Sequence, residues 1–165
     1  NVASMSDALY WVNVDNIGFD VITDSQNIIS LNASVEYKPF SSLLLGAGFK
    51  GMYYDNGADV ESGKPAFLAD FAVRYTHRKF AIGATAEAMG SRSWTFIDTT
   101  ATNGGGISRH KYPACVDLGL TFDWFVAKQC TVYVEGRNLA NAKIYDWALY
   151  RRLGAGAVVG IKVQF

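Results

Sequence analysis

The sequence has little of what marks several common classes of protein. It contains only two cysteines in 165 residues, which is too few for a disulfide framework. Its 15 Lys and Arg residues are balanced by 15 Asp and Glu residues without a basic run, so the electrostatic footprint of a nucleic-acid-binding protein is missing. No segment approaches about 18 uninterrupted apolar residues, which excludes a transmembrane helix. Nevertheless, half of the residues are apolar and 14% are aromatic, and this content argues against disorder.

Alternation of apolar and polar residues explains this composition. Between residues 115 and 126 the even positions are all apolar, whereas the odd positions are mostly small or charged. A period of two predicts a β-strand with one apolar and one polar face. The same alternation occurs in seven further segments, at residues 8–15, 29–37, 42–50, 67–76, 82–88, 132–137 and 154–165. We therefore predict an all-β fold of eight strands.

The connections between these segments alternate in length. Short connections at residues 38–41, 76–79 and 126–129 are separated by longer ones at residues 54–65, 91–111 and 138–153. This regularity predicts an antiparallel up-and-down meander with short turns at one end and long loops at the other.

Two architectures satisfy the alternation. In a soluble sandwich or lipocalin-like barrel the apolar face points inward. In a transmembrane β-barrel the apolar face points outward to lipid, the polar face points inward, and aromatic residues form girdles at both interfaces. We favour the transmembrane barrel, because one face is almost purely apolar, the other carries many glycines and charges of both signs, and aromatic residues gather at the strand ends.

The last residues resemble the carboxy-terminal signal of bacterial outer-membrane proteins, which the barrel-assembly machinery reads. The chain ends on Phe165, and Val163, Ile161 and Val159 precede it at alternate positions. The resemblance implies that these four residues form an assembly signal and that the barrel-assembly machinery is a partner.

A second resemblance extends over residues 112–165. Residues 138–141 read Asn-Leu-Ala-Asn, which is similar to the "Asn-Leu-x-Asn" segment in the penultimate strand of TonB-dependent receptors. The spacings that follow are similar to the closing hairpin of that family, at Trp147, Tyr150, Gly154, Gly160 and Phe165. The family usually has Tyr three residues after the second Asn, whereas here Ile144 occupies that position and Tyr145 follows it.

The second resemblance implies the C-terminal β-barrel portion of a TonB-dependent receptor, with the last eight of about 22 strands. Residues 1–165 then form a single β-barrel unit without a plug domain, in the bacterial outer membrane, with both termini periplasmic. The implied function is energised nutrient uptake, with outer-membrane lipid, a plug domain and TonB as partners and no nucleic acid. The alternative is a complete eight-stranded outer-membrane barrel with a structural or adhesive role carried by its long external loops.

Aromatic residues in the long loops are the candidate external-loop ligand contacts. Trp94, Phe96, Trp147 and Tyr150 are suited to stack on a sugar or hold a peptide. The alternative role for the same residues is an interfacial aromatic belt combined with packing between loops.

The charges on the predicted inward face form a nearly balanced set. They are Glu36, Lys38, Lys50, Asp70, Arg74, Glu87, Asp117, Asp123, Glu135, Arg137 and Lys162. We expect them to pair with one another, because charges removed from bulk water need partners. The alternative is a substrate pathway or a surface that faces a plug.

We predict no catalytic, cofactor or metal site, and no enzyme. His110 lies in a long loop with Asp98, but neither the spacing nor a motif for a nucleophile activated by a base is present. His77 and His110 are expected at opposite ends of the strands. Cys115 and Cys130 are expected far apart, as two free thiols.

Overall fold

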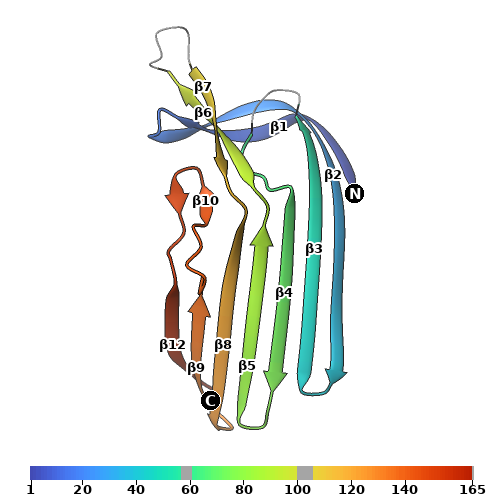
Figure 1. Cartoon of the computed structure of the whole chain (residues 1–165), viewed down its shortest axis with the longest axis vertical. Coiled ribbons are helices and arrows are strands. Elements are labelled where there is room, and N and C mark those ends of the chain that lie inside the picture. Colours follow the sequence, from blue (N-terminus) through green and yellow to red (C-terminus); the bar gives the residue numbers. More distant parts are fainter. Residues whose placement is uncertain (57–60, 100–105, 165) are drawn as a thin grey trace.

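The computed structural model describes residues 1–56, 61–99 and 106–164, and its regular elements are all β-strands (Figure 1). In chain order they are β1 (Val2–Val14), β2 (Gly18–Phe40), β3 (Leu43–Asn56), β4 (Phe67–Thr76), β5 (Phe80–Met89), β6 (Arg92–Asp98), β7 (Gly106–Tyr112), β8 (Cys115–Ala127), β9 (Cys130–Arg137), β10 (Tyr145–Trp147), β11 (Tyr150–Arg151) and β12 (Gly156–Val163). Within these ranges no helix has the length and apolar content needed to cross a membrane.

Most of the strands belong to one large sheet. Its strand order over the described residues is β12-β9-β8-β5-β4-β3-β2-β1-β6-β7, and β10 and β11 form a separate hairpin. Neighbouring strands are antiparallel, except that β1 runs parallel to β6 where Asn13 and Val14 lie opposite Phe96 and Ile97. The predicted all-β class and its antiparallel pairing are confirmed.

The two ends of the sheet differ. Strands β2, β3, β4, β5, β8, β9 and β12 stand side by side, with short turns and the C-terminal end of the chain at one end (Figure 1). The opposite end of the sheet is the loop end. There, residues 8–24 of β1 and β2 pair with each other and fold across the sheet toward the β6–β7 hairpin. We call this paired segment the arm. Asn1 lies beside β2, where its amino group donates a hydrogen bond of 2.8 Å to the Ser30 carbonyl.

The predicted count of eight strands is not confirmed. Residues 91–111 contain β6 and β7, and residues 138–153 contain β10 and β11, where the sequence predicts long loops. These strands lack a continuous apolar face, and alternation detects only strands that have one. The turn between β1 and β2 was also missed: Asp15 and Asn16 have φ values of 53° and 58°, the positive pair that a type I′ hairpin turn requires.

The described residues do not close into a barrel, as the alternative of a complete eight-stranded barrel requires. In them, β12 pairs with β9, whereas β1 pairs with β2 and β6, so the sheet remains open. A complete eight-stranded barrel requires its first and last strands to pair, because closure is what leaves no exposed edge. This pairing pattern does not support the alternative of a complete eight-stranded barrel.

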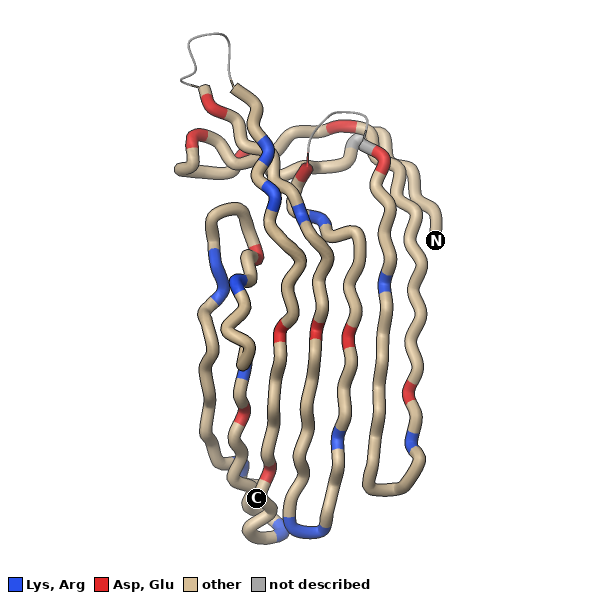
Figure 2. Tube along the Cα trace, in the orientation of Figure 1, with Lys and Arg blue, Asp and Glu red and all other residues tan. Residues whose placement is uncertain are grey.

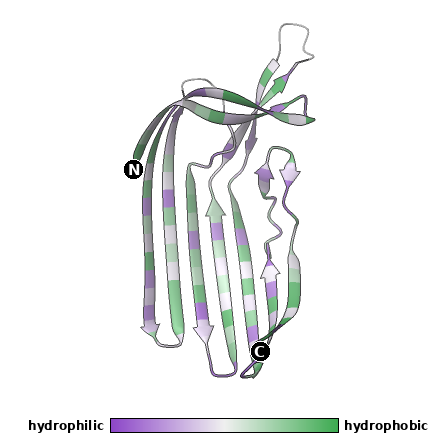
Figure 3. Cartoon of the chain, turned by 180° about the vertical axis from the view of Figure 1, so that it is seen from behind, coloured by the Kyte–Doolittle hydropathy of each residue, from purple (hydrophilic) through white to green (hydrophobic). Residues whose placement is uncertain are grey.

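The two faces of the sheet differ in exposure as the alternation predicts. Along β8, Leu118, Leu120, Phe122 and Trp124 are 40–52% exposed. The residues that alternate with them, from Asp117 to Asp123, are partly buried. Hydrophobic and hydrophilic bands alternate along the long strands (Figure 3). The apolar face is therefore the more exposed one, which is the reverse of a soluble sandwich.

Glycines on the polar face make room for larger polar side chains on the neighbouring strand. Gly48 lies opposite Asp70, and a Cβ atom on it would lie 2.3 Å from Asp70 Oδ1. Gly119 lies opposite Thr85, and its Cβ atom would lie 2.5 Å from Thr85 Oγ1. The many glycines that mark this face in the sequence thus permit a layer of polar groups over the sheet.

Candidate functional site

Three carboxylates form a row across the middle of the polar face. Asp70 on β4 lies opposite Glu87 on β5, and Glu87 lies opposite Asp117 on β8. Acidic segments are visible at one level on these strands in Figure 2. Because like charges directly opposite each other destabilise a sheet, this row needs a cation nearby.

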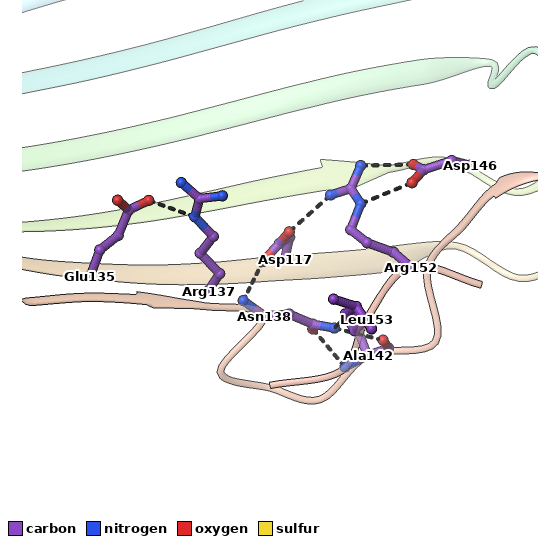
Figure 4. A network of polar contacts seen from close by, with 8 residues as sticks. All are labelled: Asp117, Glu135, Arg137, Asn138, Ala142, Asp146, Arg152 and Leu153. Carbon is purple, nitrogen blue, oxygen red and sulfur yellow. Dashed lines mark hydrogen bonds and ion pairs between the residues drawn. The ribbon is translucent and has the colours of Figure 1, made fainter. Parts of the chain in front are cut away.

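Arg152, in the connection between β11 and β12, supplies that cation (Figure 4). Its Nη1 donates to Asp117 Oδ2 at 3.1 Å. Its Nη2 and Nε donate to the two carboxylate oxygens of Asp146 at 2.7 and 3.1 Å, the two-pronged geometry that Arg forms with carboxylates. These hydrogen bonds to Asp146, and the nearby charge of Asp117, raise the pKa of Arg152.

Asn138 holds the two ends of the long β9–β12 connection together (Figure 4). Its side-chain amide donates to the Ala142 and Leu153 carbonyls at 3.0 and 3.2 Å, and its side-chain oxygen accepts from the Ala142 N–H at 2.9 Å. Its backbone N–H donates to Asp117 Oδ1 at 3.0 Å. Asn138 is 2% exposed, so all of these hydrogen bonds are formed away from water.

The Asn-Leu-Ala-Asn segment therefore has a structural role. Asn138 and Asn141 have φ values of 47° and 50°, in the left-handed region that Asn tolerates better than most residues. The Asn141 N–H donates to the Asn138 carbonyl at 2.8 Å, which closes the turn. Ile144, which stands where the family usually has Tyr, is 2% exposed, and Tyr145 packs against Tyr112 with ring centroids 4.7 Å apart and planes inclined by 44°.

The other charges of the polar face are partly paired, as expected. Arg74 forms an ion pair of 2.7 Å with Asp123, Arg137 one of 2.6 Å with Glu135, and Lys38 one of 3.8 Å with Glu36. Lys162 lies over the ring of Tyr133, 4.7 Å from its centroid. Asp70 and Glu87 depart from the expectation, because each faces another acid across the sheet.

Two cavities flank the Arg152 cluster on the polar face. One of about 370 Å³ is lined by the three carboxylates of the row, Ile144 and Arg152. The other, of about 700 Å³, is lined by Glu87, Asp117, Glu135, Arg137 and Arg152. Both are walled by charges of both signs together with apolar side chains.

The four predicted loop aromatics separate into two kinds. Trp94 and Phe96 are 3% and 5% exposed and belong to a buried cluster with Ala148, so their burial favours packing between loops. Trp147 and Tyr150 are 46% and 61% exposed. Three of the four surround Phe19, a residue that the sequence does not mark, with ring centroids 5.9–6.3 Å away: Trp94, Trp147 and Tyr150. Phe96 instead lies against the His110 ring, 4.3 Å from its centroid.

The residues of the predicted assembly signal lie on the exposed face of β12. Val159, Ile161 and Val163 are 70%, 66% and 52% exposed, on the side of the sheet that carries the apolar residues. Phe165 lies outside the described residues.

The histidines and cysteines remain separate. His77 lies in the β4–β5 turn against Phe80, at the opposite end of the sheet from His110. Cys115 and Cys130 begin neighbouring antiparallel strands and are free thiols. In the part of the chain that the structure describes, no three His, Cys, Asp or Glu residues are grouped as metal ligands.

No protein-family model and no curated protein matches the sequence. The structure is nevertheless similar to several solved structures. With FpvA of P. aeruginosa in a complex with a heterologous pyoverdine and iron, the TM-score is 0.76 at 9% identity, over 99% of this chain and 24% of that chain. With the copper transporter OprC, it is 0.73 at 12% identity, over 99% and 27% of the two chains. With the ferric enterobactin receptor PfeA of Pseudomonas aeruginosa, it is 0.71 at 9% identity, over 99% and 28%.

These proteins are TonB-dependent receptors, and the chain has the fold of a portion of their barrels. It spans about a quarter of their length. The neighbours are receptors and a transporter rather than enzymes.

Proposed function

We propose that this chain forms part of the wall of a TonB-dependent outer-membrane receptor that takes up a nutrient with energy supplied through TonB. The observation that carries the proposal is the exposed apolar face of a long-stranded sheet whose fold matches those receptor barrels. Exposed apolar surface costs about 25 cal/mol per Å² in water, so a continuous apolar face calls for an apolar surrounding. Outer-membrane lipid is that surrounding.

The polar face is proposed to face a plug domain. The paired charges, the carboxylate row and the two cavities suit contact with a hydrated, mixed-charge surface. The three structural neighbours are a pyoverdine–iron receptor, a copper transporter and a ferric enterobactin receptor, which makes a metal-containing nutrient our proposed class of cargo.

Two groups of residues take roles in this proposal. Val159, Ile161, Val163 and Phe165 form the signal that the barrel-assembly machinery reads, and the short turns at the C-terminal end of the sheet lie on the periplasmic side. Trp147 and Tyr150, exposed at the loop end, contact the incoming ligand. Trp94 and Phe96 stabilise the loops through the buried cluster that they form with Ala148.

Quenching of tryptophan fluorescence by brominated lipid tests the membrane placement. The chain is folded into phosphatidylcholine vesicles that contain bromine near the headgroup, and Trp124→Phe is compared with Trp147→Phe. The two tryptophans are similarly exposed, at 52% and 46%, but Trp124 lies on the apolar face of the large sheet and Trp147 ends β10, in the separate hairpin. We expect Trp124→Phe to remove most of the quenching and Trp147→Phe to leave it. Equal quenching in both variants, or no insertion into the vesicles, contradicts the proposal.

A further inference from the structure

A third cavity, at the loop end of the polar face, contains two cations. Its volume is about 290 Å³, and it lies between the arm, the end of β3 and the start of β6. Its walls include Arg92, Lys64, Tyr10, Tyr54, Gln26 and Ser93. Glu61 is the one carboxylate among the described residues that line it.

The backbone places the two cations side by side. Ser62 forms a β-bridge with Trp94, the Gly63 N–H donates to the Ser93 carbonyl at 2.9 Å, and the Thr95 N–H donates to the Glu61 carbonyl at 2.8 Å. These contacts hold residues 61–63 along the start of β6, and the next residue, Lys64, lines the same cavity as Arg92, the first residue of β6. Two like charges around one small cavity repel each other unless an anion lies between them.

Gly63 brings the segment this close to the sheet. Its φ of 69° lies in the left-handed region, and a Cβ atom on it would lie 2.2 Å from the buried Trp94 indole. A residue with a side chain is therefore excluded here by both backbone strain and the indole. This close approach of residues 61–63 to β6 brings the neighbouring Lys64 to the cavity.

Arg92 is a buried charge that has no carboxylate partner among the described residues. It is 6% exposed, and its Nε is fully buried with no hydrogen-bond partner. No carboxylate of these residues lies within ion-pair distance of its guanidinium. Because Arg stays protonated in proteins, a buried guanidinium without a partner is destabilising, and an anion beside it would remove that cost.

Lys64 is held by neutral groups. Its Nζ donates to Gln26 Oε1 at 2.8 Å and lies 5.1 and 5.6 Å from the ring centroids of Tyr10 and Tyr54. Burial lowers the pKa of Lys64, and no carboxylate in the described residues forms an ion pair with it. Asp24 lies near Tyr10, and one of its oxygens is buried without a hydrogen bond, but it does not line the cavity.

Hydroxyl donors complete the cavity. Ser91 and Ser93 line it, and the Tyr54 hydroxyl donates to the Met52 sulfur at 2.9 Å. A thioether is a weak acceptor, so this hydroxyl is available to a stronger one. Two cations and several hydroxyls around one small cavity match the oxygens of a tetrahedral anion better than the two oxygens of a carboxylate.

We propose that this cavity is a binding site for a phosphate group, held between the Arg92 guanidinium and the Lys64 ammonium. Arg binds two phosphate oxygens through its planar fork, and Lys binds as a point charge from the other side. The inference is independent of the membrane placement, since it rests on the cavity alone. The phosphate comes either free from solution or as part of a phospholipid headgroup.

The test is binding of inorganic phosphate to the full chain folded in a non-ionic detergent. Titration calorimetry at constant ionic strength, set with sodium chloride, is compared for the original chain, Arg92→Gln, Lys64→Gln and the control Lys111→Gln. Lys111 is an exposed cation on β7. We expect saturable binding at one site, weakened at least tenfold by Arg92→Gln and by Lys64→Gln and unchanged by Lys111→Gln. Lys64→Gln decides the matter if Arg92→Gln does not fold, because Lys64 lies in a connection rather than in a strand.

A second titration, with dihexanoyl phosphatidic acid below its micelle concentration, distinguishes the sources. Tighter binding of the lipid than of inorganic phosphate, lost in the same two variants, assigns the site to a lipid headgroup. Equal or weaker binding of the lipid assigns it to free phosphate. The proposal is overturned if neither probe binds saturably, or if both cation variants bind as the original chain does.

Discussion

Asn138 combines two properties at the residue scale that no other residue type offers equally. Its short amide side chain reaches both the Ala142 backbone and the Leu153 carbonyl, and its backbone adopts a φ of 47°. Asn tolerates this region because its polar side chain hydrogen-bonds locally. The structure thus gives a physical reason for an Asn at the start of the Asn-Leu-Ala-Asn segment.

Replacement of Asn138 tests that account. Asn138→Ala removes three side-chain hydrogen bonds, two to the Ala142 backbone and one to the Leu153 carbonyl, so we expect a loss of about 2–3 kcal/mol in unfolding free energy. Asn138→Gly is the control, since Gly lacks the same side chain but accepts positive φ at little cost. We expect Gly to lose slightly less than Ala. Urea unfolding in detergent measures both, and an unchanged midpoint for Asn138→Ala would refute the role.

At the scale of elements, the long β9–β12 connection is fastened to the sheet by charge. Arg152 forms ion pairs with Asp146, which lies in the same connection, and with Asp117 on β8. Asp117 is the end of the carboxylate row that includes Glu87 and Asp70. The side chains of Arg152 and Asp117 are 43% and 21% exposed, so solvent screens their attraction in part. The ion pair between Arg152 and Asp117 therefore contributes little to the free energy of unfolding, although it offsets repulsion within the carboxylate row.

A double-mutant cycle isolates this contact. Arg152→Gln and Asp117→Asn are made singly and together, and their unfolding free energies are compared. We expect a favourable coupling of about 0.5–1 kcal/mol, the range of partly exposed ion pairs. Asp117→Asn also relieves the repulsion from Glu87, so we expect it to cost less alone than Arg152→Gln. Strictly additive effects would show that the pair contributes nothing.

At the scale of the whole molecule, the sheet separates two environments. One face presents apolar side chains along its length, and the other shelters charges, glycines and three cavities. The arm and the β6–β7 hairpin cover the loop end through β1–β6 pairing and the aromatic cluster around Phe19. The same substitution should therefore affect folding in a membrane differently on the two faces.

Neighbouring residues on β8 provide the matched pair for this comparison. Leu120 is 50% exposed on the apolar face, and Thr121 lies on the polar face. In a bilayer, Leu120→Arg places a charge in hydrocarbon at a cost of about 2–4 kcal/mol near the midplane, whereas Thr121→Arg places it among polar groups. We expect Leu120→Arg to reduce the folded fraction in vesicles, read from the heat-dependent gel shift, and Thr121→Arg to retain it. Equal folding of the two variants would argue against a lipid-facing apolar side.

The sequence alone determined the class of fold and the identity of the two faces, because strand side chains alternate with a strict period and one residue of shift would exchange the faces. It did not reveal β6, β7, β10 and β11, whose residues lack an apolar stripe. Open pairing of the sheet and the parallel contact of β1 with β6 were equally hidden, since both depend on which distant segments meet.

The sites divide in the same way. Pairing of inward charges followed from the cost of unpaired charge, but Arg152 as the partner of Asp117 did not, because the two lie 35 positions apart, with the rest of β8 and all of β9 between them. Lys64 and Arg92 appear in the sequence as ordinary loop cations. Only the tertiary structure brought them to one cavity, through the pairing of residues 61–63 with 93–95, and buried Arg92 with no carboxylate of the described residues within ion-pair distance. Local pattern determines which face a side chain occupies; long-range pairing determines which side chains meet.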